Sequence, residues 1–354
     1  MLVSIIGSAG IPAQYGGFET LAEQLVINLQ DDIEFEVFCS KSAYKQHPTH
    51  YQKARLIYIP LNANGIQSIP YDIISIFKSL KSDILLVLGV AGAIIFPFIK
   101  LLTSKKVIVH LDGIEWKRDK WNWIAKKYLK FSEALAVRCA DKIISDNEEI
   151  QRYVKERYLK DSVLIEYGAD HFSLENSELA NLNAQLPAVY AFSVCRIEPE
   201  NNIHLILEAF SAAEMHLVII GNWDRSEYGR SLLQQYAKHT NIHLLGPIYD
   251  QQKLNAIRAK AKIYIHGHSA GGTNPSLVEA MYLKLPVVAF DVPYNRATTE
   301  GKAFYFSDKE NLKNIVESLS EGALVEVAGK MSEIAERRYR WTIVAEKYKN
   351  LFVG

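Results

Sequence analysis

The fold is decided by the stretch His266-Gly267-His268-Ser269-Ala270-Gly271-Gly272-Thr273-Asn274-Pro275-Ser276-Leu277-Val278-Glu279-Ala280-Met281. The preceding run 261–265 is apolar and predicts a buried strand. Leu277, Val278 and Met281 recur at helical spacing and predict a helix. A strand, a glycine-rich loop and a helix in this order are typical of a nucleotide-type α/β unit.

The loop and the helix start form a candidate site for a phosphate or a sugar. Thr273 or Asn274 can cap the helix, and Pro275 suits its first turn. Unpaired N–H groups at a helix start attract anions, and Gly271-Gly272 would let a ligand approach the backbone closely. Glu279 lies one turn inside the helix and is a further candidate ligand group. A glycine turn in any Rossmann-like unit would also satisfy this pattern.

Proline, an apolar pair and Glu-Ala-Met at this place in the chain resemble the donor site of retaining glycosyltransferase family 4. That family usually carries Glu-x7-Glu; Glu279 matches the second glutamate, whereas the first position is Gly271. The motif His-Ser-x-Gly-Gly-Thr-Asn-Pro-Ser-Leu is similar to that of a bacterial rhamnosyltransferase subgroup. The resemblance implies a donor-binding loop and a Glu279 that binds the nucleotide ribose. The implied loop residues are His268, Gly271, Gly272, Thr273 and Asn274.

Composition indicates an ordinary globular protein. The chain has 354 residues, 49% hydrophobic and 23% charged, which favours two domains. The formal net charge of zero gives no indication of a nucleic-acid partner. Cys39, Cys139 and Cys195 are far apart, which argues against a disulfide framework or a zinc site and fits a reducing cytosol. We expect neither a signal peptide nor an internal repeat.

A second glycine loop lies near the amino terminus. The apolar run 1–7 predicts a strand, and the apolar residues after Gly17 predict a helix. The loop lacks Gly-x-Gly-x-x-Gly, so a dinucleotide site is weakly supported. Gly-Ile-Pro-x-x-Tyr-Gly-Gly-Phe-Glu-Thr is similar to the same subgroup, which implies that Gly16 and Gly17 face the donor phosphates. A turn that merely requires positive φ is the alternative.

Alternating strand and helix patterns predict an α/β protein with mainly parallel sheets. The resemblance implies the GT-B fold, two facing Rossmann-like domains with an interdomain cleft. We expect one domain over 1–172, a linker over 173–185, a second domain over 186–339, and a last helix over 340–354 that packs on the first domain. The apolar run 84–99 predicts a strand and a buried helix, because it is too short to span a membrane. The predicted strands are 36–39, 55–59, 84–88, 107–110, 142–144, 163–165, 188–194, 216–220, 242–245, 262–265, 286–290 and 303–306.

Several polar side chains follow the predicted strand 107–110 directly. Open α/β sheets bind their ligands at the carboxyl ends of such strands. The segment Asp-Gly-x-Glu-Trp-Lys-Arg resembles the acceptor side of the same subgroup. Asp112 and Glu115 are candidates to orient or deprotonate an acceptor hydroxyl, and His110 is a third. The alternatives are helix capping by the two carboxylates and a hydrogen-bonded core position for His110.

The segment after the strand 188–194 is a candidate diphosphate site. The resembled family has an arginine there and a lysine five residues later; Arg196 matches, but the second position is Asn201. Arg196 can bind phosphate in bidentate fashion, and Arg296 is a candidate for the missing charge. The resemblance places Gly246 and Pro247 at the base. No Asp-x-Asp follows a strand, so neither a metal nor another cofactor is implied.

The segment 100–131 is basic and aromatic. Residues 100–130 hold nine basic and three acidic side chains, interleaved with tryptophan and tyrosine. Cationic stems beside aromatic rings suit a membrane headgroup region, so a peripheral membrane face is one hypothesis. A solvated amphipathic helix is the other.

These observations predict a cytoplasmic, peripheral-membrane retaining glycosyltransferase. The resemblance implies that it moves a sugar, L-rhamnose from dTDP-rhamnose, onto a glycan or lipid-linked acceptor during surface polysaccharide synthesis. Departing diphosphate would be stabilised electrostatically. Three alternatives stay open: another sugar nucleotide as donor, a GT-B phosphorylase or epimerase, and a non-catalytic glycan-binding subunit.

Overall fold

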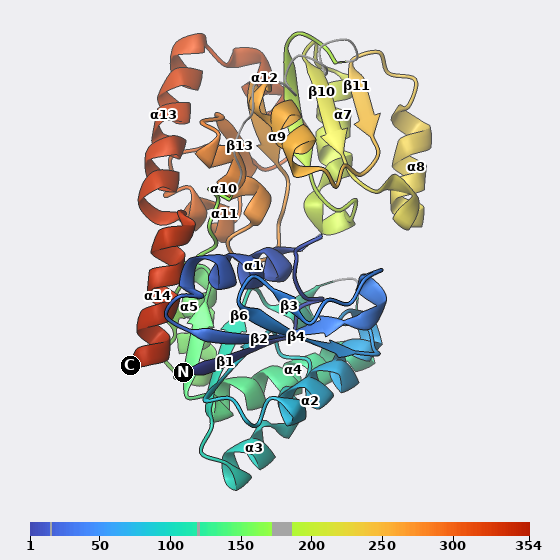
Figure 1. The fold of residues 1–354 in the computed structure, drawn as a ribbon. Coiled ribbons are helices and arrows are strands. Elements are labelled where there is room, and N and C mark those ends of the chain that lie inside the picture. The colour runs from blue at the N-terminus through green and yellow to red at the C-terminus, as the bar shows by residue number, and fades with distance from the viewer. Residues whose placement is uncertain (15, 119–120, 172–185) are drawn as a thin grey trace. The chain divides into compact units, whose positions relative to one another are not determined.

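The computed structural model describes residues 1–14, 16–118, 121–171 and 186–354 (Figure 1). The chain divides into two compact units, which we call unit 1 and unit 2. Unit 1 comprises Met1–Tyr167 and Trp341–Gly354, and unit 2 comprises Gly168–Arg340. The linker predicted over 173–185 lies outside the described residues.

Unit 1 is built on an eight-stranded sheet in the order β3-β4-β2-β1-β5-β6-β7-β8. The pairs are parallel except β3 with β4. Its strands are β1 (Leu2–Ile6), β2 (Glu34–Ser40), β3 (His50–Tyr51), β4 (Ala54–Ile59), β5 (Ile84–Leu88), β6 (Lys106–Leu111), β7 (Lys142–Ser145) and β8 (Val163–Leu164). Its α-helices are α1 (Gly17–Leu29), α2 (Ser68–Lys78), α3 (Phe96–Leu102), α4 (Trp123–Cys139), α5 (Glu148–Tyr158) and α14 (Trp341–Val353).

Unit 2 is built on a six-stranded parallel sheet in the order β11-β10-β9-β12-β13-β14. Its strands are β9 (Tyr190–Val194), β10 (His216–Ile220), β11 (Ile242–Leu245), β12 (Ile263–His266), β13 (Val287–Phe290) and β14 (Phe304–Phe306). Its helices are α7 (Ile203–Ser211), α8 (Glu227–Tyr236), α9 (Gln251–Ala259), α10 (Pro275–Tyr282), α11 (Pro293–Thr298), α12 (Lys309–Ser318) and α13 (Glu321–Arg338).

The predicted parallel α/β pattern is confirmed in both sheets. Each predicted strand has a counterpart whose bounds differ by a few residues at most, and the run 84–99 folds as β5 followed by α3. The central strands, such as β5 and β10, are buried on both faces, so their apolar runs are continuous. The short antiparallel strand β3 was not predicted, because two polar edge residues carry no apolar pattern.

Both sheets reverse their strand order at one point. In unit 1 the reversal lies between β1 and β5, and in unit 2 it lies between β9 and β12. Loops at the carboxyl ends of two such strands diverge and leave room for a ligand. The two glycine loops follow β1 and β12, so each begins at the reversal of its own sheet.

The last helix, α14, belongs to unit 1 and lies against α1 (Figure 1). Its Tyr348 hydroxyl is 2.8 Å from His110 Nδ1, and its Lys347 Nζ is paired with the buried Glu166. In the other direction, Lys106 Nζ donates to the carbonyl of Leu351 at 2.9 Å. These contacts tie the carboxyl terminus to the centre of the unit 1 sheet.

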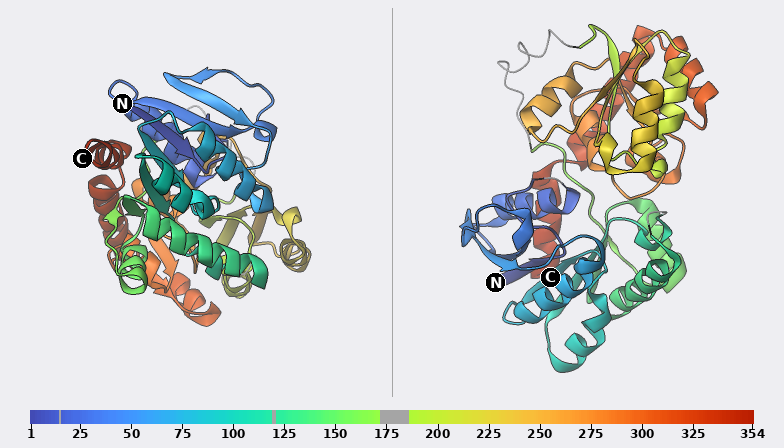
Figure 2. Two further views of the ribbon diagram at one scale, coloured as in Figure 1. Left: turned by 90° about the horizontal axis from the view of Figure 1, so that it is seen from below. Right: turned by 90° about the vertical axis from the view of Figure 1, so that its right-hand side faces the viewer.

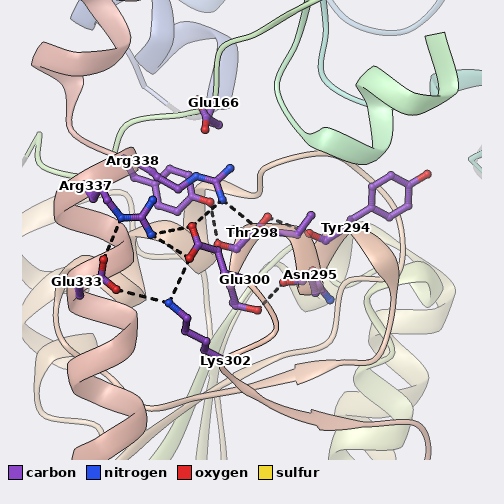
Figure 3. Close-up of polar contacts among 12 residues, drawn as sticks. Glu166, Tyr294, Asn295, Thr298, Glu300, Lys302, Glu333, Arg337 and Arg338 are labelled. Carbon is purple, nitrogen blue, oxygen red and sulfur yellow. Dashed lines mark hydrogen bonds and ion pairs between the residues drawn. The ribbon is translucent and has the colours of Figure 1, made fainter. Parts of the chain in front are cut away.

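A charged cluster fixes the turn after α11 in unit 2 (Figure 3). Glu300 has a positive φ of 50° and accepts hydrogen bonds from Arg337 at 2.8 Å and from Arg338 at 3.2 Å. Lys302 lies 3.3 Å from the same carboxylate and 3.7 Å from Glu333. The arginines hold the pKa of Glu300 below its ordinary value against the effect of burial, which raises it. The cluster therefore joins α13 to the strand β14.

Candidate functional site

The donor loop predicted from the sequence, residues 267–274, follows β12 directly. It is anchored to the segment after β9, the neighbouring strand. Asn202 Nδ2 donates to the carbonyl of Gly267 at 2.9 Å, and Ser269 N donates to the carbonyl of Glu200 at 2.9 Å. A Cβ on Gly267 would lie 2.2 Å from the carbonyl oxygen of Asn201, so only glycine fits there. The two loops at the strand reversal are therefore held as one piece.

Gly271 is different, because it lies at the open part of the loop. Its φ is 122°, a value that L side chains rarely adopt, and a Cβ built there would meet no atom within 4 Å. The glycine is thus required by the backbone conformation and leaves open space beside the chain. A glutamate, which the resembled family has here, would be strained.

The start of α10 is organised as predicted. The Asn274 side chain caps the helix by accepting from Ser276 N at 3.2 Å, and Pro275 occupies the first turn. Ser276 Oγ also binds Asn274 Oδ1 at 2.9 Å and Tyr264 Oη at 2.9 Å. Thr273, the other predicted cap, is buried. The cap satisfies one N–H group, and the helix dipole still favours an anion at this end.

Glu279 has two partners that the sequence did not predict. Its Oε2 is 2.8 Å from Nη2 of Arg258, which comes from α9, and its Oε1 is 3.6 Å from His171 Nε2. The Arg258 side chain is 1% exposed, and its Nη1 donates to Asn255 Oδ1 at 2.9 Å. The carboxylate is therefore anchored at one oxygen. The sequence signal for this pairing is weak: Arg258 lies four residues after the apolar Leu254, and both are buried on α9.

Arg196 follows β9 and is half-buried. Within the described ranges, no carboxylate lies at ion-pair distance from its guanidinium, so its charge is available for an anion. Asn201 is buried and its Nδ2 donates to the carbonyl of Arg196 at 2.7 Å, which shapes the backbone that carries this arginine. Direct contact of Asn201 with a donor stays a prediction.

Arg296, the candidate for the missing charge, is paired with a carboxylate, and its role toward a diphosphate stays a prediction. Its guanidinium makes two hydrogen bonds to Asp291, at 2.6 and 2.8 Å, and lies 4.1 Å from the centre of the Tyr305 ring. The bonds from Arg296 lower the pKa of Asp291. This arginine is therefore neutralised where it stands.

Two further donor-side predictions lie at the carboxyl ends of strands. Gly246 and Pro247 follow β11 and are exposed. His268 stacks on His266, with the ring centres 4.3 Å apart and the rings inclined by 10°. His266 is fully buried, and burial lowers its pKa from 6.5 to about 3, so the ring is neutral. Among the residues that the structure describes, neither of its ring nitrogens has a hydrogen-bond partner.

On unit 1, the candidate His110 lies inside the core. Its side chain is buried on β6, its Nδ1 pairs with Tyr348 Oη, and its ring meets Phe18 edge to face at 5.4 Å. Burial lowers its pKa from 6.5 to about 3. The ring is neutral, and its Nε2 has no hydrogen-bond partner within the described part of the chain. A catalytic role for His110 stays a prediction.

The other acceptor-side candidates follow β6. Asp112 is exposed, directly after the strand end. Glu115 begins the short 3-10 helix Glu115–Lys117 and is already engaged. Its Oε1 accepts from Trp121 Nε1 at 2.8 Å, and its Oε2 lies 3.4 Å from Arg118 Nη1. A role of Asp112 or Glu115 toward an acceptor stays a prediction.

The first glycine loop ends at the start of α1. Gly16 has φ 143°, and a Cβ there would collide with the carboxylate of Glu19, while Gly17 is the first helical residue. Glu19 folds back, and its Oε1 accepts from Ala9 N at 2.6 Å. Burial raises the pKa of Glu19. The paired glycines therefore allow the helix start and the loop to approach closely.

The described residues contain neither a candidate metal site nor a candidate membrane-spanning helix. Among residues 1–14, 16–118, 121–171 and 186–354, no group of three histidine, cysteine or carboxylate side chains is arranged to hold a metal ion. The helices in the same ranges include none that combines the length and the apolarity needed to cross a bilayer.

Comparison with known proteins agrees with this geometry. Residues 1–170 match a domain of unknown function, DUF1972, and residues 177–338 match the family Glycosyl transferases group 1. Sucrose-phosphate synthase from Thermosynechococcus elongatus has a similar structure, with a TM-score of 0.84, 16% identity, and 99% of this chain and 98% of that one covered. Anabaena HepE in complex with UDP-glucose follows with a TM-score of 0.77, 15% identity, and 100% and 99% covered. The chain therefore has the GT-B fold, and its residues 177–338 match the family Glycosyl transferases group 1.

Proposed function

We propose that this chain is a retaining, metal-independent glycosyltransferase that moves L-rhamnose from dTDP-rhamnose to a glycan, carried on a lipid, in surface polysaccharide synthesis. The single observation that supports transfer from a sugar nucleotide is the arrangement in unit 2. There Arg196, the open loop at Gly271 and the start of α10 all extend from the strand reversal between β9 and β12. Rhamnose itself rests on the motif His-Ser-x-Gly-Gly-Thr-Asn-Pro-Ser-Leu.

In this proposal the donor diphosphate binds Arg196 and the amides of the donor loop. The guanidinium and the positive end of α10 stabilise the negative charge that develops on the leaving diphosphate. No carboxylate competes for Arg196 within the described ranges, which supports this role. Glu279 binds the ribose through Oε1, which lies 3.6 Å from His171 Nε2, and Arg258 fixes the carboxylate at Oε2.

Recognition of the sugar falls to the backbone. Gly271 removes the carboxylate that contacts sugar hydroxyls in the resembled family, and its surroundings are open. Loop amides and His268, which stacks on the buried His266, remain as neighbours for the sugar ring. A 6-deoxy sugar has one hydroxyl fewer and is suited to such a site. On unit 1, Asp112 orients the acceptor hydroxyl.

The test is a panel of sugar nucleotides, measured first by thermal shift and then by turnover. A donor present at 100 times its Kd adds about 2.7 kcal/mol of stability. We expect dTDP-rhamnose to stabilise the chain most and to be consumed when a lipid-linked glycan is added. UDP-glucose is the second donor to test, since it is the compound bound to HepE. Stabilisation without consumption of any donor would favour a non-catalytic subunit.

We further propose a cytoplasmic location at the membrane surface, where a lipid-linked acceptor is available. Fractionation of cells into soluble and membrane material measures this directly. Release from the membrane fraction by high salt would indicate peripheral attachment.

A further inference from the structure

The basic residues of segment 100–131 differ in their partners. Lys100 pairs with Asp141 at 2.6 Å, Lys106 binds carbonyls of α14, and Arg118 pairs with Glu115. These cations are used inside unit 1. Lys117, by contrast, lies beside Trp116, and Lys127 and Lys130 lie on α4, so these three cations are close to one another.

These lysines line an open pocket of about 340 Å³ beside Trp116, which we call the Trp116 pocket. Lys130 Nζ lies 4.9 Å from the centre of the Trp116 ring and Lys117 Nζ lies 5.7 Å from it. Lys127 Nζ lies 4.9 Å from the Trp123 ring. In the part of the chain that the structure describes, no carboxylate pairs with Lys117, Lys127 or Lys130. The pocket is lined by Trp116, Lys117, Lys126, Lys127 and Lys130.

The floor of the Trp116 pocket is fixed by a buried carboxylate. Glu133 is 2% exposed and its Oε1 accepts from Trp116 Nε1 at 3.3 Å, from Tyr153 Oη at 2.6 Å and from Tyr158 Oη at 2.6 Å. Burial, together with these bonds to Glu133, raises the pKa of both tyrosines, so they remain donors. The guanidinium of Arg157 lies 5.5 Å from the Trp116 ring. The cations therefore surround a ring that is already held in position.

Large apolar side chains are exposed beside this pocket. On α4, Trp123 is 67% exposed, and Ile124 and Phe131 are also exposed. Trp123, Lys127 and Lys130 are spaced by four and three residues, so they share one face of the helix. The helix α3 packs against α4 (Figures 1 and 2) and exposes Phe98, Leu101 and Leu102, with Leu101 at 81%.

We propose that this face of unit 1, formed by the Trp116 pocket and the exposed apolar side chains of α3 and α4, docks on a phospholipid bilayer with anionic headgroups. A headgroup phosphate binds among Lys117, Lys127 and Lys130, and the apolar side chains enter the acyl boundary. The chain has no net charge, so the attraction is local to this face. A soluble phosphate compound would need the lysines but would leave Phe98, Leu101 and Leu102 in water. A bilayer accounts for both sets.

The docking face deepens the lipid-linked acceptor of the proposed function, but its test needs neither donor nor acceptor. The full chain is sedimented with vesicles of phosphatidylcholine, with and without phosphatidylglycerol. Wild type should bind the mixed vesicles, and binding should weaken with salt. Lys127→Gln with Lys130→Gln should lower the partition coefficient roughly 25-fold, since each lysine near an anionic surface contributes about fivefold.

The apolar half of the face is tested separately. Trp123→Ser and Leu101→Ser should each lower binding about tenfold or more, because each removes a large side chain from the acyl boundary. Both positions are exposed, so these variants should fold normally. Matched controls in unit 2 are Lys238→Gln with Lys253→Gln, which remove the same charge, and Val325→Ser. The controls should bind as wild type does.

Four results would overturn the docking face. They are failure of wild type to bind anionic vesicles, equal losses in the controls, full binding by the lysine variant, and full binding by both serine variants. Inorganic phosphate that shifts the melting temperature while vesicles do not bind would assign the pocket to a soluble anion instead. Donor-induced thermal shifts, measured on the same variants, report on donor binding and do not require the docking face. Failure of glycosyl transfer and failure of docking are therefore separable.

Discussion

Replacing Arg258 by methionine probes how Glu279 is held. The guanidinium lies 2.8 Å from the carboxylate, and the two side chains are 1% and 12% exposed. Removing one partner of a buried ion pair costs about 3–5 kcal/mol, because the other charge stays unpaired. His171, 3.6 Å from the other oxygen, compensates less than the arginine does. With about 2–4 °C per kcal/mol for a unit of this size, the melting temperature should fall by about 6–20 °C.

A double-mutant cycle with Glu279→Gln separates binding from stability. Glu279→Gln alone should raise the donor KM about tenfold, equivalent to about 1.4 kcal/mol, with a smaller loss in kcat. In the double variant no buried charge remains, so stability should recover relative to Arg258→Met. The donor KM should nevertheless stay raised. Calorimetric melting and steady-state kinetics below the melting temperature measure both.

Three outcomes would contradict these roles of Arg258 and Glu279. If Arg258→Met melts like wild type, the ion pair does not hold the carboxylate. If Glu279→Gln changes stability but leaves the donor KM unchanged, Glu279 serves the fold and not the donor. A covalent glycosyl adduct on Glu279 would contradict a binding role altogether. Arg225→Met, at an exposed position of the same unit, is the control and should change stability by less than about 0.5 kcal/mol.

Three further predictions concern single residues. Arg196→Ala should weaken donor and free-nucleotide binding by roughly 1.5–3 kcal/mol, the range for a hydrogen bond to a charged group, whereas Arg225→Ala should not; calorimetric titration measures both. Asp112→Asn should abolish transfer and leave nucleotide affinity nearly intact, and near-normal turnover would exclude Asp112 from the site. Burial lowers the pKa of His266 from 6.5 to about 3, so below about pH 6.5 the unfolded chain binds a proton that the folded chain does not. Stability should therefore fall with acidification by about 1.4 kcal/mol per pH unit for this group, and melting curves of His266→Phe should show a shallower decline.

Most of the fold is predictable because its sheets are parallel and covered on both faces. Such strands appear in the sequence as short continuous apolar runs, and Ile84–Leu88 is found with its bounds intact. The strand His50–Tyr51 is not predicted for the same reason. It pairs at the edge of the sheet, and its side chains are not buried. The pattern of apolar residues thus predicts strands that are buried, and it misses a strand that is defined only by its hydrogen bonds to a neighbouring strand.

Site residues that belong to one sequence motif can be predicted from the sequence. Contacts between residues from distant segments cannot. Arg196 and the loop around Gly271 are both visible in the sequence, because each directly follows an apolar strand. The partner of Glu279 is not, since Arg258 comes from a separate helix and an arginine normally indicates an exposed face. The carboxylate of Glu133, which fixes the ring of Trp116, is likewise visible only after folding.

The order in which the two units can be completed during translation follows from how the chain is divided. Unit 2 is one continuous segment, whereas unit 1 takes its last helix, Trp341–Val353, from the other end of the chain. All of unit 2 is therefore synthesised before α14, and at that point unit 1, begun first, still lacks the Tyr348 hydroxyl that pairs with His110. Until then, the surface of α1 that receives α14 is exposed to other nascent chains and to chaperones. A stop codon that removes only the last fourteen residues would leave that surface open permanently.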